Sequence, residues 1–211
     1  QNGAVETAEG PVGVETVCVE EDACKEVCQA TDHVVYNLSR LGIPLIEIAT
    51  RPDIRSPEQC RECAEKIGMI LRSTSRVKRG LGTIRQDINI SIKGGERIEI
   101  KGAQDLKMIP TLVEYEVQRQ QALLAMREEL GAFEVDETQH DVTGLFKESD
   151  SKIIKKALKK GVVYVLKVPG FSGFLGREVQ PGRRLGSEIS DYAKVRAGVG
   201  GLFHSDELPK Y

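Results

Sequence analysis

The residues best suited to chemistry lie in the segment 82–101, GTIRQDINISIKGGERIEIK, in which polar and apolar side chains alternate. Successive side chains of a β-strand point to opposite faces, so the segment is predicted to form a β-hairpin with one isoleucine face and one polar face. The polar face carries Arg85, Asp87, Asn89, Glu99 and Lys101. Aspartate and asparagine are poor strand formers, which indicates that this face has a function. A solvated face with cross-strand charge pairs is the alternative.

Three further acids, Glu20, Glu21 and Glu47, are predicted at strand ends or at strand–helix junctions. Carboxylates that converge with the polar face would form an oxygen-rich site, the kind that Mg²⁺ takes together with waters and a phosphate-bearing substrate. Arg85 and Lys101 would hold phosphate oxygens there and stabilise the charge of a transferring phosphoryl group. Such a site suits ATP-dependent activation of a carboxylate. Solvated acids that share no site are the alternative.

These side chains must be positioned by strands that the pattern also predicts. Residues 1–20 are predicted to form two short strands around Glu9-Gly10. The acids of 20–22 favour the start of a short helix, because a helix N-terminus attracts negative charge. Residues 44–50 are expected to form a further strand. A three-residue loop at 93–95, ending in a left-handed glycine, keeps both apolar sets of the hairpin on one face; a five-residue loop is the alternative.

Two longer helices are expected between and after these strands. Ser56 and Pro57 are typical of a helix start, and that helix should run to about Ser73. Its apolar stripe consists of Cys60, Ala64, Ile67, Ile70 and Leu71. The second helix spans 109–130, and its Glu and Arg side chains are expected outside. Strands grouped with crossing helices, without βαβ regularity, predict an α+β fold.

The composition shifts near residue 150, so we place one part at 1–150 and a second, small α/β unit at 151–211. A strand over VVYVLKV is followed by a glycine-rich stretch at 170–176, and then by a helix capped by Ser187 that runs to about Arg196. The glycine-rich stretch lacks the Gly-Lys-Ser/Thr of a phosphate loop, so we interpret it as a turn-rich connection.

Composition excludes some classes of protein. The 211 residues are 40% hydrophobic with a formal net charge of −2, and no apolar run approaches the roughly 18–20 residues of a membrane span. Because the net charge is slightly negative, any binding of nucleic acid must use a local basic patch, for which residues 72–85 and 151–160 qualify. Five cysteines without a signal peptide favour a reduced, cytoplasmic protein. The Cys60-x-x-Cys63 pair has no second such pair, so ordinary helix residues are expected there.

Four ordered motifs resemble one known family. They are NLSRLGIPLIEIATRPDIRSPEQ at 37–59, LGTIRQDINISI at 81–92, RIEIKGAQ at 97–104 and EYEVQRQ at 114–120. They are similar to the kinase-type subunit of the tRNA-dependent amidotransferases, the GatB/GatE family. Within it, QDINIS and IKGAQ resemble the archaeal type, GatE. The stretch from VVYVLKV to HSDELP is similar to a domain, called GAD, that GatE shares with bacterial aspartyl-tRNA synthetases.

The resemblance implies a fold and an activity. The fold would be an antiparallel-sheet cradle with crossing helices, followed by part of the small α/β insertion domain. The activity would convert Glu-tRNA(Gln) into Gln-tRNA(Gln): ATP phosphorylates the glutamate γ-carboxylate, and ammonia displaces the phosphate. The cofactors would be ATP and Mg²⁺. The ammonia would come from an asparaginase-like partner subunit, so a hetero-oligomer without a membrane association is expected.

The family's metal-binding acids fall on Glu20 and Glu47, by their placement in EED and PLIEI. The catalytic set implied is Glu20, Glu47, Arg85, Asp87 and Lys101. ATP would be bound by Arg85, Asn89, Glu99 and Lys101.

One departure qualifies this expectation. The family begins with an acid-x-His motif that supplies further metal ligands, and the first histidine here is His33, expected in a helix-to-strand connection. We therefore expect an internal fragment, cut at both ends, that neither phosphorylates nor amidates on its own. A rival interpretation is a non-catalytic module that binds tRNA or a partner subunit through residues 151–211.

Overall fold

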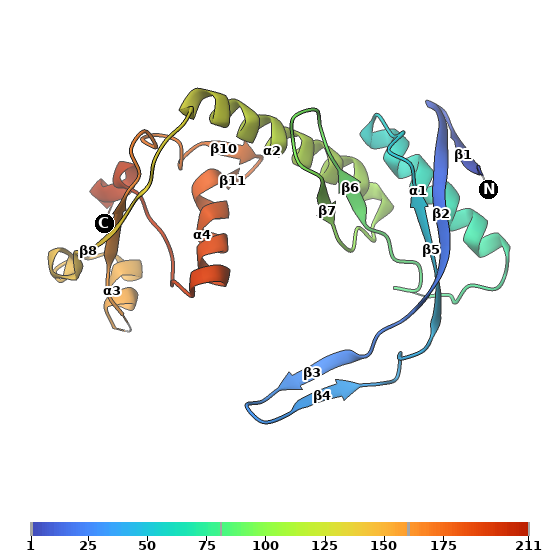
Figure 1. The fold of residues 1–211 in the computed structure, drawn as a ribbon, viewed down its shortest axis with the longest axis horizontal. Helices are drawn as coiled ribbons and strands as arrows, with labels where there is room; N and C mark the ends of the chain where they lie inside the picture. Colours follow the sequence, from blue (N-terminus) through green and yellow to red (C-terminus); the bar gives the residue numbers. More distant parts are fainter. Residues whose placement is uncertain (1, 81, 160, 211) are drawn as a thin grey trace. The chain divides into compact units, whose positions relative to one another are not determined.

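A computed structural model describes residues 2–80, 82–159 and 161–210; Gln1, Leu81, Lys160 and Tyr211, which belong to segments discussed above, lie outside the described residues. The chain divides into two compact units, one of Gln1–Ile88 and Lys101–Thr111, the other of Asn89–Ile100 and Leu112–Tyr211. Figure 1 labels the elements along the chain. Strands and helices are mixed, and every strand pair whose register is known among the described residues is antiparallel. The expected α+β character is thus confirmed.

The first unit is built on a three-stranded sheet of order β1-β2-β5, with β1 at Ala4–Thr7, β2 at Gly10–Glu21 and β5 at Pro44–Thr50. The turn near Glu9-Gly10 is where the pattern predicts it, but β2 is one long strand that pairs with β5 over most of its length.

A β-bulge in β2 governs which side chains share a face. The register shifts between Val14 and Thr16, so Glu15 is an extra residue without a partner on β5. Because of it, Val14 and Val17 fall on the same face although their numbers differ in parity. Cys18, Glu20 and Glu47 fall on the other face, since Cys18 pairs with Glu47 and side chains alternate along each strand.

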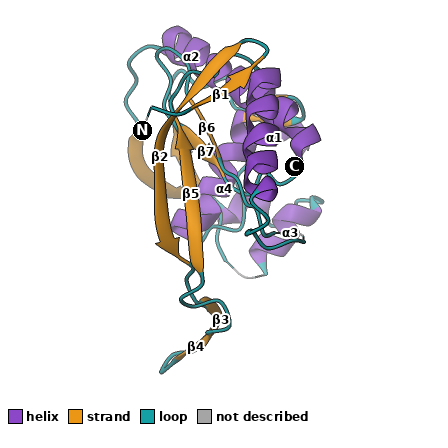
Figure 2. Ribbon diagram, turned by 90° about the vertical axis from the view of Figure 1, so that its right-hand side faces the viewer, coloured by secondary structure: helices purple, strands orange, loops and turns teal. Residues whose placement is uncertain are grey.

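The helix expected after residue 20 is wrong. The chain instead forms a two-stranded ribbon of β3 (Lys25–Gln29) and β4 (Val34–Asn37), which leads back into β5. Figure 2 shows the ribbon continuing from the ends of β2 and β5. The pairing of β2 with β5 carries the chain onward as strand, and this tertiary constraint overrides the helix preference of the acids. His33 lies in the tight turn of this ribbon, where the Ala30 amide donates to its carbonyl.

Helix α1 (Pro57–Ser73) begins as predicted: the Ser56 hydroxyl accepts from the Gln59 amide at 3.0 Å. It packs on the sheet through Cys63, which joins Val5 and Val12 in a small buried core. The predicted stripe is wrong at one position, since Ile70 is 57% exposed, whereas Cys63 is buried. The residues of α1 that pack into this core, Cys63 and Ile67, lie in the middle of the helix. The cysteines of α1 are free thiols in the helix, and burial raises the pKa of Cys60 to about 11.

The hairpin that carries the polar face is shorter than predicted. Its strands are β6 (Ile88–Ile90) and β7 (Ile98–Ile100), and they pair with each other. The loop closes with a hydrogen bond from the Gly95 amide to the Ile92 carbonyl at 2.9 Å. The left-handed residue is Gly94, with φ +83°, rather than the last residue of the loop. Ile88 and Ile90 are buried and the polar side chains are exposed, so the predicted two-faced character is confirmed.

The second unit is organised around α2 (Ile109–Leu130), which has the predicted bounds. Its far end packs against β10 (Glu178–Gln180), β11 (Arg183–Arg184) and α4 (Leu185–Ala197) through a core of Met126, Phe174 and Val179. The expectation that its Glu and Arg side chains lie outside holds for Glu114, Arg127, Glu128 and Glu129. It is wrong for Glu116, which is buried, and for Arg119, whose side chain is only 18% exposed; Gln120 is buried beside them. Partners from other elements, described below, make this burial possible.

The remaining elements of the second unit are β8 (Asp136–Asp141), α3 (Lys152–Leu158), β9 (Tyr164–Lys167) and short 3₁₀ turns at Thr143–Phe146 and Ser205–Lys210. A further 3₁₀ turn, at Leu106–Met108, belongs to the first unit. The strand predicted over VVYVLKV is β9, paired with β8. Ser187 is not a cap, because α4 already begins at Leu185, after Arg184.

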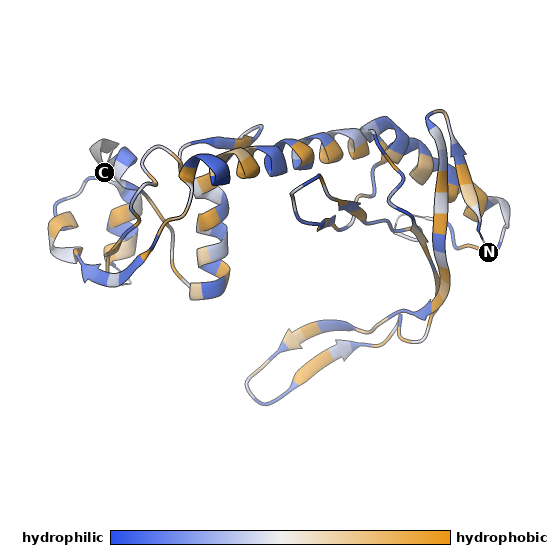
Figure 3. Ribbon diagram, turned by 45° about the horizontal axis from the view of Figure 1, so that its top comes forward, coloured by the Kyte–Doolittle hydropathy of each residue, from blue (hydrophilic) through white to orange (hydrophobic). Residues whose placement is uncertain are grey.

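Apolar side chains remain exposed in places. Figure 3 shows hydrophobic positions on both strands of the β3–β4 ribbon, and Val27 and Tyr36 there are 62% and 50% exposed. Among the described residues, none of the helices has the length and apolar character that crossing a membrane requires.

Candidate functional site

Two of the predicted metal ligands meet on the strand pair β2–β5. Glu20 and Glu47 each offer a carboxylate oxygen, and Cys18 offers its sulfur, with all three atoms within 4.8 Å of one another. The register explains the cluster: Cys18 lies opposite Glu47, and Glu20 follows two residues later on the same face. All three residues are exposed. Sequence reasoning missed Cys18, for which the only signal was its alternation with Glu20.

The negative charges in this acid cluster (Cys18, Glu20 and Glu47) repel one another. Hydrogen bonding to Glu47 and repulsion from its charge raise the pKa of Glu20. Desolvation, and then the charges of Glu47 and Glu20, raise the pKa of the Cys18 thiol. Among the described residues, no basic side chain pairs with either glutamate within 4 Å. A cation placed between the carboxylates would relieve this repulsion.

The donor set fits Mg²⁺ through its two carboxylates. Magnesium prefers oxygen ligands and fills its other positions with water or phosphate oxygens. The raised pKa keeps Cys18 a neutral thiol at neutral pH, and its sulfur lies 3.9 Å from Glu47 Oε2. A neutral thiol is a poor ligand for a hard cation. Glu20 and Glu47 therefore suit the metal, and Cys18 lies beside them.

Arg85 is held next to this strand by an acid that sequence reasoning missed. Asp22, only 8% exposed, follows β2 directly and lies two residues after Glu20. Its carboxylate accepts from Arg40 Nε at 2.6 Å and lies 3.7 Å from Arg85 Nη2. The hydrogen bond and charge of Arg40, with the charge of Arg85, lower the pKa of Asp22. This contact links the segment before the hairpin to the end of β2 and leaves Arg85 half exposed.

Asp87 and Lys101 also lie in the first unit, at the base of the hairpin. Lys101 Nζ is 3.9 Å from Asp87 Oδ2, and Asp87 Oδ1 accepts from the Gly102 amide at 2.8 Å. Asp87 and Lys101, both predicted on the polar face, are thus within ion-pair distance of each other. Asn89 and Glu99 are both exposed on the hairpin and belong to the second unit.

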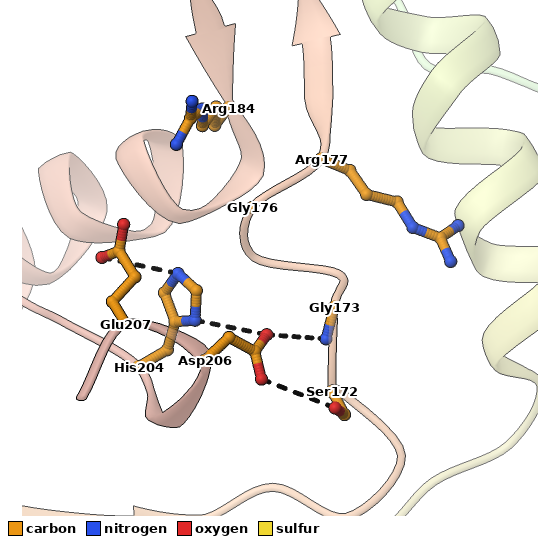
Figure 4. A pocket seen from close by; sticks show the side chains of 8 residues that line it. All are labelled: Ser172, Gly173, Gly176, Arg177, Arg184, His204, Asp206 and Glu207. Carbon is orange, nitrogen blue, oxygen red and sulfur yellow. Dashed lines mark hydrogen bonds and ion pairs between the residues drawn. The ribbon is translucent and has the colours of Figure 1, made fainter. Parts of the chain in front are cut away.

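A separate pocket of about 440 Å³ lies in the second unit, where none of the predicted site residues contributes to it. His204 and Asp206 line it together with the glycine-rich stretch (Figure 4). Asp206 Oδ2 accepts from the Gly173 amide at 2.7 Å and lies 3.4 Å from His204 Nδ1. The stretch is a series of turns, as predicted. Its Gly173 amide already donates to a carboxylate of the chain itself, that of Asp206.

Comparison with known families identifies two domains. The sequence profile of the GatB/GatE catalytic domain matches residues 1–165. The profile of the GAD domain matches residues 153–211. The first match includes the acid cluster and the hairpin, and the second includes α4 and the pocket.

Curated relatives agree with these matches. The chain is 59% identical over 215 residues to a protein of Methanocaldococcus jannaschii that is named as the E subunit of glutamyl-tRNA(Gln) amidotransferase, with all of this chain and 34% of that protein covered. Proteins of the same name from Methanococcus maripaludis and Methanosarcina acetivorans are each 57% identical over all of this chain, covering 34% and 33% of their lengths. The chain thus spans about a third of the length of these relatives. With a profile match over most of its residues and such similarity over all of them, the chain belongs to the GatB/GatE family.

Proposed function

We propose that this chain forms the ATP-using part of a tRNA-dependent amidotransferase subunit that converts Glu-tRNA(Gln) into Gln-tRNA(Gln) in the cytoplasm. The identity of 59% over the whole chain to the E subunit of a glutamyl-tRNA(Gln) amidotransferase carries this proposal. The convergence of Glu20 and Glu47 supports it, because phosphoryl transfer from ATP needs a divalent cation. The mixed sheets and helices would form a cradle, and residues 153–211 would correspond to the domain of bacterial aspartyl-tRNA synthetases.

The residue roles follow from the charges on each element. Glu20 and Glu47 would hold Mg²⁺, which neutralises phosphate charge when it is bound. Arg85 and Lys101 would bind phosphate oxygens, and Asp87 would orient Lys101 through their contact of 3.9 Å. The exposed polar groups of Asn89 and Glu99 are proposed to bind the nucleotide.

The chemistry turns a poor electrophile into a good one. An oxygen of the glutamate γ-carboxylate attacks the terminal phosphorus of ATP, and ADP leaves with the electrons of the broken P–O bond. Ammonia then attacks the acyl phosphate carbon, phosphate leaves, and the nitrogen loses a proton to give the amide. Preorganised positive charge around the phosphates would stabilise the first step. The ammonia would come from an asparaginase-like subunit in a hetero-oligomer.

The decisive experiment measures ADP release and Gln-tRNA(Gln) formation by the complete subunit, assembled with its ammonia-producing partner. We expect both products only with ATP and Mg²⁺, and neither with Glu47→Gln. Glu21→Gln is the matched control, because Glu21 lies on β2 beside Glu20 but on the opposite face. Full ADP release by Glu47→Gln would contradict the proposed metal site.

A binding module without chemistry makes a different prediction. The basic helix α3 and the GAD domain would then bind Glu-tRNA(Gln) in a gel shift, in preference to other tRNAs, while the complete subunit released no ADP. On our proposal the complete subunit forms product, whereas the 211-residue chain alone is expected to form none.

A further inference from the structure

Two polar side chains on α2 are buried where a helix would normally present apolar ones. Glu116 and Gln120, one turn apart, are 6% and 4% exposed. Burying a charge is costly unless it is paired and hydrogen-bonded. A surface helix has no need of such residues for its own stability, so their partners indicate what their burial achieves.

On one side the partner is α4. Arg119 donates to both carboxylate oxygens of Glu116, from Nε at 2.8 Å and from Nη2 at 3.1 Å. Its third nitrogen, Nη1, donates to Glu188 Oε2 at 3.0 Å. Glu188 lies in the first turn of α4 and is 17% exposed in its side chain. The planar guanidinium thus binds one carboxylate on each helix, a geometry that lysine does not offer.

On the other side the partner is the hairpin. Gln120 Nε2 donates to Glu116 Oε1 at 2.8 Å and to the carbonyl of Ile90, the last residue of β6, at 3.3 Å. No donor among the described residues reaches Gln120 Oε1. A Cβ on residue 95 would overlap that oxygen, so only the glycine at this position lets the hairpin loop lie against α2.

The geometry points to a positioning relay that runs from α4 to the hairpin. Glu188 holds Arg119, Arg119 holds Glu116, and Glu116 orients Gln120, which fixes the hairpin backbone at Ile90. All of these residues lie in the second compact unit. Hydrogen bonds between charged groups in a poorly solvated place strengthen one another, so loss of one member loosens the next. The GAD domain thereby holds β6, the strand that carries Asn89.

This relay goes beyond the proposed function, because the link between α4 and the hairpin exists whatever the hairpin binds. Its consequence for ATP rests on the proposed function, which assigns the hairpin's polar face to the nucleotide. Gln120 and Glu188 would then be positioning residues for the site.

The first test compares two acid-to-amide variants on α4 by hydrogen exchange of the backbone amides of residues 89–100. Glu188→Gln removes the charge that pairs with Arg119 Nη1 at 3.0 Å and, at 3.7 Å, with Arg183 Nε. The control Asp191→Asn removes the closer partner of Arg183 and the partner of Lys194 but leaves the pair of Glu188 with Arg119, so it accounts for any effect that passes through Arg183. We expect exchange in the hairpin to rise roughly three- to tenfold in Glu188→Gln and to stay at the parent level in Asp191→Asn. Equal hairpin exchange in the parent and Glu188→Gln would overturn the relay.

The second test separates a relay from general destabilisation. If the coupling passes through Gln120, Glu188→Gln should change nothing further in a Gln120→Leu background, although each variant alone raises hairpin exchange. Effects that simply multiply would overturn the relay. Should Gln120→Leu fail to fold, Gly95→Ala interrupts the same link, because its Cβ would displace the Gln120 amide.

Kinetics of the complete, assembled enzyme then test the consequence for ATP. We expect Glu188→Gln to raise the KM for ATP several-fold and to leave the KM for Glu-tRNA(Gln) unchanged, with no change in Asp191→Asn. If hairpin exchange rises while the KM for ATP is constant, the relay stands and the assignment of the hairpin to the nucleotide fails. The two proposals thus fail in distinguishable ways.

Discussion

The acid cluster on β2–β5 and the polar cluster on α2 (Glu116, Arg119 and Gln120) differ in how their charges are balanced. On α2, Glu116 is buried, and Arg119 neutralises it with two hydrogen bonds. On the strands, Glu20 and Glu47 are exposed and lie against each other, so the hydrogen bond and the charge of Glu47 raise the pKa of Glu20. Compensated charge in the interior serves architecture, whereas uncompensated like charge opposes folding. The strand cluster is therefore the better candidate for a site that awaits a cation.

The largest expected effect is a loss of stability when the polar cluster on α2 loses its positive charge. Arg119→Met leaves the Glu116 carboxylate buried without a positive charge beside it, with the Gln120 amide as its remaining donor. This should lower the free energy of unfolding by about 3 kcal/mol. Urea denaturation measures this change. The double variant Glu116→Met/Arg119→Met should recover most of the loss, since both charges are then absent. If the single variant is as stable as the parent protein, the two clusters do not differ as we describe.

The acid cluster should show the reverse behaviour, with loss of activity and no loss of stability. Glu20→Gln in the complete amidotransferase should reduce ATP-dependent Gln-tRNA(Gln) formation by at least about 100-fold, because a metal ligand is lost. The urea midpoint should not fall. Glu15→Gln, on the same strand at the bulge, is the control and should keep its activity. A parallel loss of activity and stability in Glu20→Gln would assign the cluster to architecture.

Asp87 lies between these extremes, exposed but with two contacts. Asp87→Lys places like charges beside Lys101 on the polar face, and we expect about a tenfold fall in ATP-dependent product formation. Stability should change by less than about 1 kcal/mol, as for other exposed pairs. Unchanged kinase activity in this variant would mean that the polar face is merely solvated.

The smallest effects are opposite in sign and appear in the pH dependence of stability. The pKa of Glu20 is raised above 4.5 in the folded protein, so its carboxylate destabilises the fold above that pKa. Glu20→Gln should therefore be slightly more stable than the parent at neutral pH, and the difference should vanish as the pH falls towards 4.5.

Asp22 gives the matching comparison. Its folded pKa is lowered below 3.8, so the stability that it contributes is present above 3.8 and is lost as the pH falls through the folded pKa. Asp22→Asn should be less stable than the parent at neutral pH and approach it in acid. Urea midpoints across this pH range measure both variants, and shifts of equal sign would contradict the contrast between Glu20 and Asp22.

Local signals predicted the elements that local chemistry determines. The Ser56 cap and the apolar stripe located α1, the bounds of α2 were predicted, and the alternation of isoleucines located the two-faced hairpin. The β3–β4 ribbon was missed because the acids of 20–22 favour a helix start, whereas the strand continues through its pairing with β5, which follows more than 20 residues later. Long-range pairing leaves no mark on the local pattern.

The site was predictable to a smaller extent. Glu20 and Glu47 were assigned through family resemblance, because no spacing rule brings residues so far apart in sequence to opposite strands. Asp22 was missed because its partner Arg40 comes from a distant turn. Glu116 was expected outside with the other Glu and Arg side chains of the helix, since charged residues on a helix are normally solvated, and the burial of Gln120 was not anticipated. Only Gly95 and Glu188, from other parts of the fold, explain their burial.

The bulge in β2 also predicts where this strand tolerates a change in length. Removing Glu15 leaves Val14 opposite Thr50 and Thr16 opposite Ala49, so the ladder becomes regular and the side chains beyond it stay where they are. Removing a residue between Cys18 and Glu20 instead turns Glu20 to the face that carries Val17. The strand thus contains one dispensable position, and sequences one residue shorter at that point can still build the same pair of carboxylates.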